Sequence, residues 1–301
     1  MHILGQIDVH GVSRRGATHT KNHDHFAIAT LSKSMRLHQS NLSIDDNSRV
    51  HGHNQGHLFL VADGISGAPA PKQASGKAVD SVVQYFLNEM PWYHFADGSP
   101  EEVTLALEDA LSNAQDDFFR TMPDKVGMGT TLTIALVFWP DLYIAHVGDS
   151  SCHLKRRESI HKLTTDHTVA EVHKELGGRC SLADENTLWN VIGGHDPDIY
   201  PDVQHMTLEL DDVLVLLTDG IAEAELNQKL ETVLRKKCSA EEICDQLVDR
   251  PRDDDQTAIA IRFLRHEEVF AESGAAIALE PMPAEQEPPL SLQISTKSLE
   301  T

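Results

Sequence analysis

Two apolar runs in this chain end abruptly in Asp-Gly, and this repeated pattern constrains the fold more than any other feature. The first run covers residues 58–62 and leads into Asp63 and Gly64, and the second covers 213–217 and leads through a threonine into Asp219 and Gly220. A short apolar run bounded by turn residues is typical of a buried strand. Each aspartate is therefore expected at a strand end, where the sheet meets solvent or a ligand.

Two further acidic corners accompany this pair. Asp149 follows the apolar run at 142–147, and an acidic triplet at 253–255 precedes the strand-like residues 257–261. A single Asp-Gly is usually only a turn. Carboxylates at buried strand ends, however, need partners, because isolated charge is costly to desolvate, and no comparable set of Arg or Lys lies at these positions. We therefore expect the carboxylates to converge around divalent cations that take oxygen ligands, such as Mg²⁺ or Mn²⁺.

Composition narrows the classes of partner. The chain has 301 residues with 25 Lys and Arg against 47 Asp and Glu, a formal net charge of -22. This balance argues against nucleic acid or an anionic membrane as a partner. No apolar run is long enough to span a membrane, and the N-terminus lacks the pattern of a signal peptide. The four cysteines show no CxxC spacing, so we expect reduced thiols in a cytoplasmic protein, and we expect a monomer.

The order of predicted elements favours a layered α+β fold with antiparallel sheets. Strands are predicted at 3–9 and 25–29, as a hairpin, and at 130–138 and 142–147, as a second hairpin. Ser99 is predicted to cap a helix that runs to about residue 119. The remaining predictions are helices at 73–90, 168–176, 223–237 and 241–248, and strands at 203–210, 213–218 and 257–263.

Two segments are predicted to lie outside these layers. Residues 32–56 are polar and are expected to form a long, mobile insertion. Its His51 and His53, together with His57, would either bind zinc or nickel or belong to an ordinary polar loop, and we favour the loop. From residue 265 the chain is rich in Pro and Glu. This shift predicts one domain at 1–264 and an acidic, disordered tail at 265–301.

Seven short motifs occur along the chain in one order. They are NHD at 22–24, VADGISG at 61–67, MGTT at 128–131, VGDS at 147–150, LTTDHT at 163–168, LTDG at 217–220 and DDQT at 254–257. In this order they resemble the metal-dependent serine/threonine protein phosphatases of the 2C type, the PPM family, and most of all its bacterial single-domain members. The resemblance implies a four-layer α-β-β-α sandwich with two central antiparallel sheets, and a site for two Mn²⁺ or Mg²⁺ ions at one edge.

The resemblance also implies the role of each acidic residue. Asp63 would bridge the two ions, and a water held between them, through Asp63 and Asp219, would attack the phosphorus of phosphoserine or phosphothreonine. The substrate would be a phosphoprotein, the product of a Ser/Thr kinase, and no Cys or Ser nucleophile would be needed. A third, weaker ion would bind Asp149 and Asp184. The full set of implied metal ligands is Asp24, Asp63, Gly64, Asp149, Asp184, Asp219 and Asp254.

Two positions depart from the family's pattern. His19 stands where the family usually has an arginine that anchors the substrate phosphate, so that phosphate binding would fall to His19 and Lys21, with Arg14 or Arg15 as alternatives. His23 replaces the usual Glu or Gln before Asp24. These departures leave a second hypothesis open, a catalytically weak or silent phosphatase-like module that binds a partner. A third is a hydrolase of small phosphate esters.

Overall fold

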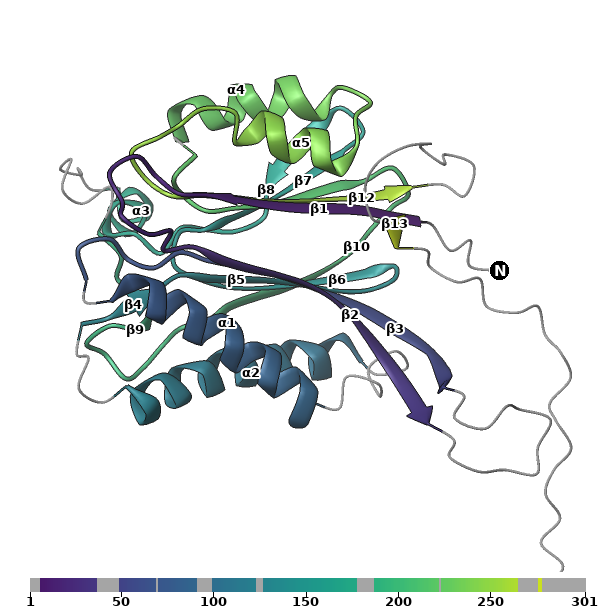
Figure 1. Cartoon of the computed structure of the whole chain (residues 1–301), viewed down its shortest axis with the longest axis horizontal. Coiled ribbons are helices and arrows are strands. Elements are labelled where there is room, and N and C mark those ends of the chain that lie inside the picture. The colour runs from purple at the N-terminus through teal and green to yellow at the C-terminus, as the bar shows by residue number, and fades with distance from the viewer. Residues whose placement is uncertain are drawn as a thin grey trace, which may run out of the picture.

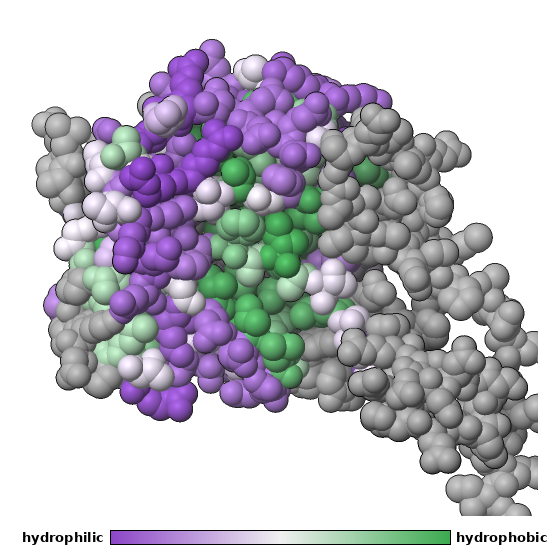
Figure 2. Space-filling view, in the orientation of Figure 1, coloured by the Kyte–Doolittle hydropathy of each residue, from purple (hydrophilic) through white to green (hydrophobic). Residues whose placement is uncertain are grey.

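The structure, a computed structural model, describes residues 6–36, 49–68, 70–90, 99–122, 127–177, 187–221, 223–264 and 276–277. Two antiparallel sheets lie face to face, and a pair of helices covers the outer face of each sheet (Figure 1). The predicted α-β-β-α sandwich is therefore confirmed. A space-filling view in the same orientation shows hydrophobic residues gathered between hydrophilic outer layers (Figure 2).

The first sheet has six strands in the order β13-β1-β12-β11-β7-β8. Helices α4 and α5 pack on its outer face (Figure 1). The bounds of these elements are β1 Gln6–Arg14, β7 Ser151–Arg156, β8 Ser159–Lys162, β11 Val213–Leu217, β12 Gln256–Leu264, β13 Ala276–Ile277, α4 Glu223–Leu234 and α5 Ala240–Leu247.

The second sheet has five strands in the order β10-β6-β5-β3-β2, and α1 and α2 pack on its outer face. A short pair, β4 with β9, and the small helix α3 lie near one end of the sandwich (Figure 1). The bounds are β2 His25–Arg36, β3 Arg49–Ala62, β4 Gly129–Thr130, β5 Leu132–Phe138, β6 Asp141–Val147, β9 Ile192–Gly193, β10 Asp202–Thr207, α1 Pro71–Asn88, α2 Pro100–Thr121 and α3 Val169–Glu175.

The continuous apolar run on β3 serves two cores at once. Successive side chains of a strand point to opposite faces of the sheet. Leu58, Leu60 and Ala62 pack in the core beneath α1 and α2, whereas Phe59 and Val61 pack in the core between the two sheets. Residues 58–62 show no polar alternation because both faces of the strand are covered there.

The run on β11 has the same arrangement in the other sheet. Leu214 and Leu216 pack between the sheets, and Val213, Val215 and Leu217 pack beneath α4 and α5. The two apolar runs that lead into the Asp-Gly corners are thus covered on both faces. Burial on both faces fixes where each strand ends, and therefore where its aspartate lies.

Most of the predicted helices and strands are present within a few residues of their expected bounds. Ser99 caps α2 as predicted, because its hydroxyl accepts a hydrogen bond from the Glu102 N–H at 3.4 Å. The second predicted hairpin is β5 with β6. None of the described helices combines the length and apolar character that a membrane span requires.

The predicted hairpin of the first two strands is wrong. The strand β1 pairs with β12 and β13, whereas β2 pairs with β3 in the other sheet. The two strands are neighbours in sequence but belong to different, facing sheets. Ile7 and Val9 of β1 point into the core between these sheets, so β1 packs over the second sheet and does not pair with β2.

The predicted mobile insertion at 32–56 is also largely wrong. The strand β2 continues to Arg36 and β3 already begins at Arg49, so both extend a hairpin beyond the core. Residues 37–48, and the side chains of His51 and His53, lie outside the described residues. His57 is a buried residue of β3 and does not belong to a polar loop.

Little of the predicted tail is described. Within it the structure describes only β13, whose Ile277 and Ala276 pair with Ile7 and Asp8 of β1. The rest of 265–301 lies outside the described residues. The domain boundary near residue 264 and the disorder of the tail stay predictions.

Three buried histidines make the stability of this fold sensitive to acid. Burial lowers the pKa of His57 to about 4 and that of His153 to about 4, and burial together with the neighbouring His167 lowers the pKa of His146 to about 3. These histidines stay neutral in the folded chain at pH values where the unfolded chain binds protons. Stability is therefore lost as the pH falls from about 6.5 toward 4.

We predict that replacing His57 by Leu weakens this pH dependence. Between pH 7 and pH 5 the free energy of unfolding of the native chain should fall by about 1–2 kcal/mol more than that of the variant. Urea unfolding at a series of pH values measures the difference. The control is His161→Gln, which removes an exposed histidine of β8 and should leave the slope unchanged. Equal slopes for the native chain and His57→Leu would contradict the prediction.

Candidate metal centre

The register of β2 and β3 places two carboxylates side by side. His25, the first residue of β2, pairs with Ala62, the last residue of β3. Asp24 and Asp63 are the next residues beyond this pair, and they lie at the same edge of the sheet. The two carboxyl groups lie close enough for each to influence the pKa of the other.

The register of the other sheet brings further carboxylates to the same edge. Leu217, the last residue of β11, pairs with Ala258 of β12 on one side and with Ser151 of β7 on the other. Asp219 therefore emerges between the acidic triplet that precedes β12 and the β6–β7 turn that carries Asp149. The loops that carry these groups lie at one end of the sandwich (Figure 1).

The backbone of Asp63 is fixed by residues at β4 and β5. The Asp63 N–H donates to the Thr131 hydroxyl at 3.0 Å, and the Thr131 N–H donates back to the Asp63 carbonyl at 2.9 Å. The Thr130 hydroxyl donates to the same carbonyl at 2.6 Å. Asp63 therefore cannot turn away from its neighbours without breaking three hydrogen bonds.

The electrostatics of Asp63 show how close the other aspartates lie. Burial raises the pKa of Asp63 well above its usual range, and Asp24, Asp219 and Asp254 raise this pKa further. No Lys or Arg forms an ion pair with Asp63 in the described part of the chain. The group is thus a buried acid surrounded by other acids, which is an unfavourable arrangement for the chain alone.

Asp24 has one oriented oxygen and one unpaired oxygen. Its Oδ2 accepts hydrogen bonds from the Thr218 hydroxyl at 2.9 Å and the Thr257 hydroxyl at 2.7 Å. Its Oδ1 is buried and has no hydrogen-bond partner among the residues that the structure describes. Burial raises the pKa of Asp24 to about 7, although the two threonine hydroxyls and Asp63 act in the opposite direction. A buried, unpaired carboxylate oxygen is a group that a cation would satisfy.

Asp149 and Asp254 complete the set at a more open rim. Burial raises the pKa of Asp149 to about 8, with Asp219 and then Asp166 adding to the effect. Burial and the nearby Asp219 likewise raise the pKa of Asp254. Asp219 itself is exposed. The donors are all carboxylate oxygens, and hard divalent cations such as Mg²⁺ and Mn²⁺ prefer that set, so the residues present fit such ions.

The two glycines of the Asp-Gly corners are required by close packing. A Cβ at Gly64 would lie 2.3 Å from the Pro71 carbonyl oxygen, and a Cβ at Gly220 would lie 1.7 Å from the Asp255 carbonyl oxygen. Both contacts are with backbone, which cannot move aside. The glycines therefore let the two acidic corners lie directly against neighbouring backbone.

The structure brings together five of the six predicted acidic ligands. Asp24, Asp63, Asp149, Asp219 and Asp254 lie at one edge, and Gly64 follows Asp63 directly. Asp184 lies outside the described residues, so its role stays a prediction.

The two predicted phosphate-binding residues, His19 and Lys21, differ in the contacts that their side chains already make. The Nδ1 atom of His19 lies 2.8 Å from Asp255 Oδ2, and its Nε2 atom lies 3.2 Å from the Ser66 hydroxyl. Both ring nitrogens of His19 are therefore already engaged. Lys21 is exposed, and within the described residues no acidic side chain forms an ion pair with it.

Sequence reasoning assigned no separate role to Asp255. Burial would raise the pKa of this carboxyl, but hydrogen bonds from the Gly16 N–H, the His23 N–H and His19 outweigh burial, so that its pKa is lowered. The two N–H groups lie 2.6 Å from its oxygens. Asp255 thereby ties the loop that carries Asp24 to the start of β12.

The threonines that orient Asp24 were also not recognised from the sequence. Thr218 directly precedes Asp219, and Thr257 follows the acidic triplet at the start of β12. The sequence did contain a signal for this role, because a threonine hydroxyl lies close to each of these two acidic segments. Its meaning depends on the pairing of β11 with β12, which the sequence alone does not give.

The comparisons with known proteins agree on one family. A family model described as protein phosphatase 2C matches residues 36–264. The serine/threonine phosphatase stp of Listeria innocua is 26% identical over 226 residues, which are 68% of this chain and 86% of the relative.

Solved structures show the same fold. The serine/threonine phosphatase Stp1 from Staphylococcus aureus aligns with a TM-score of 0.66 and 23% identity, over 87% of this chain and 97% of that chain. The catalytic domain of the phosphatase PstP in complex with two manganese ions aligns with a TM-score of 0.64 and 20% identity, over 86% of this chain and 99% of that chain. At these identities the likeness concerns the fold.

Because carboxylates crowd around Asp63, we predict that Asp63→Asn stabilises the folded chain when divalent cations are removed. Without divalent cations, the folded chain must hold the Asp63 charge among like charges or take up a proton, and both cost free energy at pH 8. The variant should therefore unfold about 2–6 °C above the native chain in a chelator, the shift that 1–2 kcal/mol gives in a domain of this size. Thermal unfolding measures this difference.

Added Mn²⁺ should reverse the order of stability. The native chain should gain stability from a ligand that binds only the folded state, and Asp63→Asn should gain much less. The control is Asp116→Asn, which changes an exposed acid of α2 in the same way. An equal gain in Mn²⁺ for the native chain and Asp63→Asn would refute the metal centre.

Proposed function

The chain belongs to the protein phosphatase 2C family, and we propose that its converging aspartates support metal-dependent hydrolysis of phosphoserine and phosphothreonine in proteins. The observation that carries this proposal is the meeting of Asp24, Asp63, Asp219 and Asp254 at one edge of the sandwich, with no cationic side chain among the described residues to pair with Asp63. The Listeria relative bears the name serine/threonine phosphatase, which supports this substrate class.

We infer that the cofactors are two Mn²⁺ or Mg²⁺ ions. The donor set is made of hard oxygen ligands, and the related fold of PstP was solved with two manganese ions. Such ions would polarise the phosphoryl oxygens and make a water acidic enough to attack phosphorus near neutral pH. The residues that would hold them are Asp24, Asp63, the Gly64 carbonyl, Asp219 and Asp254, with Asp149 and Asp184 for a third, weaker ion.

The chain's own contribution is to position oxygen ligands in advance. Thr130 and Thr131 fix the backbone of Asp63, and Thr218 and Thr257 turn one oxygen of Asp24 inward so that the other is left for an ion. The exposed Asp219 leaves the outer side of the centre open to a phosphorylated side chain. Positioned ligands of this kind place the ions where negative charge develops during the reaction.

The described cysteines argue against a thiol nucleophile. Cys152, Cys238 and Cys244 are buried and free, and burial raises the pKa of each thiol. The thiolate is the reactive form, and it is disfavoured at all three positions. This result agrees with a reaction in which water attacks phosphorus directly.

We further propose that the protein works in the cytoplasm as a monomer and removes phosphate added by a Ser/Thr kinase in a signalling process. The three described cysteines are free, which supports a reducing compartment.

The direct test of the proposed function is the hydrolysis of a phosphothreonine peptide with Mn²⁺. Asp63→Asn and Asp219→Asn should each lower kcat by at least about 100-fold, because each removes a charged ligand from the centre. Asp116→Asn, an exposed substitution on α2, should keep full activity.

Three outcomes would contradict this proposal. Unchanged turnover in Asp63→Asn would remove the aspartates from the reaction. A native chain that binds Mn²⁺ without turnover would support a silent binding module, and faster turnover of a sugar phosphate than of the peptide would point to small phosphate esters.

Phosphate binding gives a separate prediction for Lys21. The exposed Lys21 is the freer of the two candidates, so Lys21→Ala should raise KM for the phosphopeptide by about tenfold with little change in kcat. Lys21→Arg should keep KM close to native because it retains the charge. Lys236→Ala, at an exposed position after α4, is the matched control. An unchanged KM in Lys21→Ala would assign phosphate binding elsewhere.

A further inference from the structure

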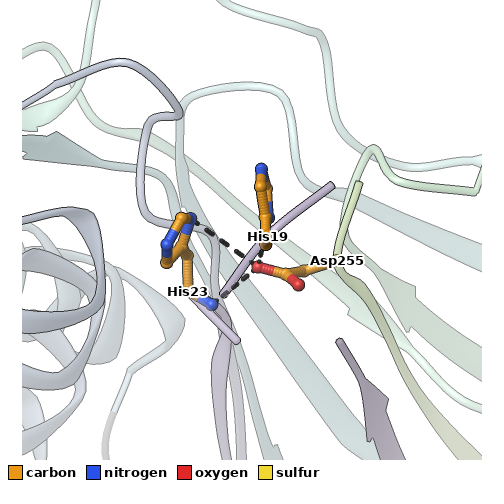
Figure 3. A group of neighbouring side chains, drawn as sticks. All are labelled: His19, His23 and Asp255. Atoms are coloured by element: carbon orange, nitrogen blue, oxygen red, sulfur yellow. Dashed lines mark hydrogen bonds and ion pairs between the residues drawn. The ribbon is translucent and has the colours of Figure 1, made fainter. Parts of the chain in front are cut away.

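A second group of potential metal ligands lies beside the aspartates and is not part of the proposed two-ion centre. His19, His23 and Asp255 each offer one nitrogen or oxygen atom, and these three atoms lie within 4.8 Å of one another. Figure 3 shows the two imidazole rings converging on one oxygen of the Asp255 carboxylate. His19 and His23 come from the loop between β1 and β2, and Asp255 directly precedes β12.

The spacing of these atoms matches a tetrahedral ion. The Nδ1 atom of His19 lies 2.8 Å from Asp255 Oδ2, and the Nδ1 atom of His23 lies 3.7 Å from the same oxygen. Zinc bonds of about 2.0–2.1 Å at tetrahedral angles place neighbouring ligand atoms about 3.3 Å apart. Both separations therefore need to change by only about half an ångström to hold an ion. The ring centroids of the two histidines are 4.3 Å apart.

His23 provides an independent indication of a ligand. Its Nδ1 atom is buried and has no hydrogen-bond partner in the described part of the chain. A buried polar atom without a partner is unfavourable, and the described side chains offer this one no hydrogen bond. The backbone of His23 is held in place because its main-chain N–H donates to Asp255 Oδ2 at 2.6 Å. An ion between the rings would satisfy the nitrogen where it already points.

The surrounding contacts would hold the other two ligands in position. The Nε2 atom of His19 lies 3.2 Å from the Ser66 hydroxyl, which can accept the proton that a metal-bound imidazole carries on its second nitrogen. Asp255 Oδ1 accepts a hydrogen bond from the Gly16 N–H at 2.6 Å, so the carboxylate is fixed from the opposite side. Histidine ligands supported in this way are typical of built metal sites.

We propose that His19, His23 and Asp255 form a site for a transition-metal ion such as Zn²⁺ or Co²⁺, separate from the site built of oxygen ligands alone. Imidazole nitrogen favours these ions, whereas Mg²⁺ and Mn²⁺ favour carboxylate and water. Three protein ligands leave one tetrahedral position for an exchangeable ligand.

The ion would lie at the rim of the aspartate site. Asp254 Oδ1 is 3.5 Å from His19 Nδ1, so the two sites are neighbours. An ion there would bring positive charge and an exchangeable position to the place where a substrate phosphate enters. This last consequence rests on the proposed function, whereas the binding of the ion does not.

The test is a titration of the full chain with Co²⁺ while excess Mg²⁺ occupies the oxygen site. Four-coordinate Co²⁺ with nitrogen ligands absorbs visible light far more strongly than six-coordinate Co²⁺ with oxygen ligands, so the readout reports the ligand set and not activity. We expect one such Co²⁺ per chain, and we expect Zn²⁺ to displace it. His23→Phe keeps a ring beside His19 but removes both nitrogens, and should weaken Co²⁺ binding by at least about 100-fold.

Matched variants make the outcome specific. His19→Gln should also lose the strong absorption, whereas His161→Gln, on the exposed β8, should keep it. Asp63→Asn should keep it as well, which separates this site from the aspartate centre. Thermal unfolding in Mg²⁺ alone identifies a variant that fails to fold, and the other histidine variant then decides.

Three results would overturn the proposal. One is the absence of strong absorption in the native chain. Another is equal absorption in the native chain, His23→Phe and His19→Gln. The third is absorption that is lost in a His51→Gln and His53→Gln double variant but kept in His23→Phe, which would place the ion on the β2–β3 hairpin.

Discussion

Repulsion among carboxylates held at one edge of the sandwich is the interaction on which the rest of this structure depends. Asp63 is buried next to Asp24, Asp219 and Asp254, and burial and these three charges all raise its pKa. No described lysine or arginine pairs with it. An arrangement that is unfavourable for the chain alone becomes favourable once cations occupy it, and this difference links folding to function.

The packing of the two sheets keeps these carboxylates together because it fixes the position of the strand ends. Residues 58–62 of β3 and the whole of β11 are buried on both faces, so neither can slip by one residue without turning apolar side chains into the wrong core. Register then decides which residues emerge at the edge. Hydrogen bonds from Thr131 to Asp63 and from Thr218 and Thr257 to Asp24 complete the positioning.

The sequence was informative wherever one short segment determined its own surroundings. The apolar runs that end at Asp63 and Asp219 correctly predicted buried strands with acids at their ends, and Ser99 correctly marked the start of α2. The failures concern contacts between distant segments. Nothing local in residues 6–36 shows that β1 and β2 belong to different sheets, and the polar stretch after residue 31 concealed a hairpin that extends beyond the core. The role of Asp255 depends on contacts with Gly16, His19 and His23 more than 230 positions away in the chain.

The measurement that tests the central claim most directly is anomalous diffraction at the manganese edge from crystals of the full chain soaked in Mn²⁺. The account predicts two strong peaks within bonding distance of the carboxylate oxygens, about 2.0–2.6 Å as for other hard divalent cations, with Asp63 in contact with both ions. Carboxylates that stay crowded at the edge with no peak between them, or peaks that lie only at scattered surface acids, would contradict it.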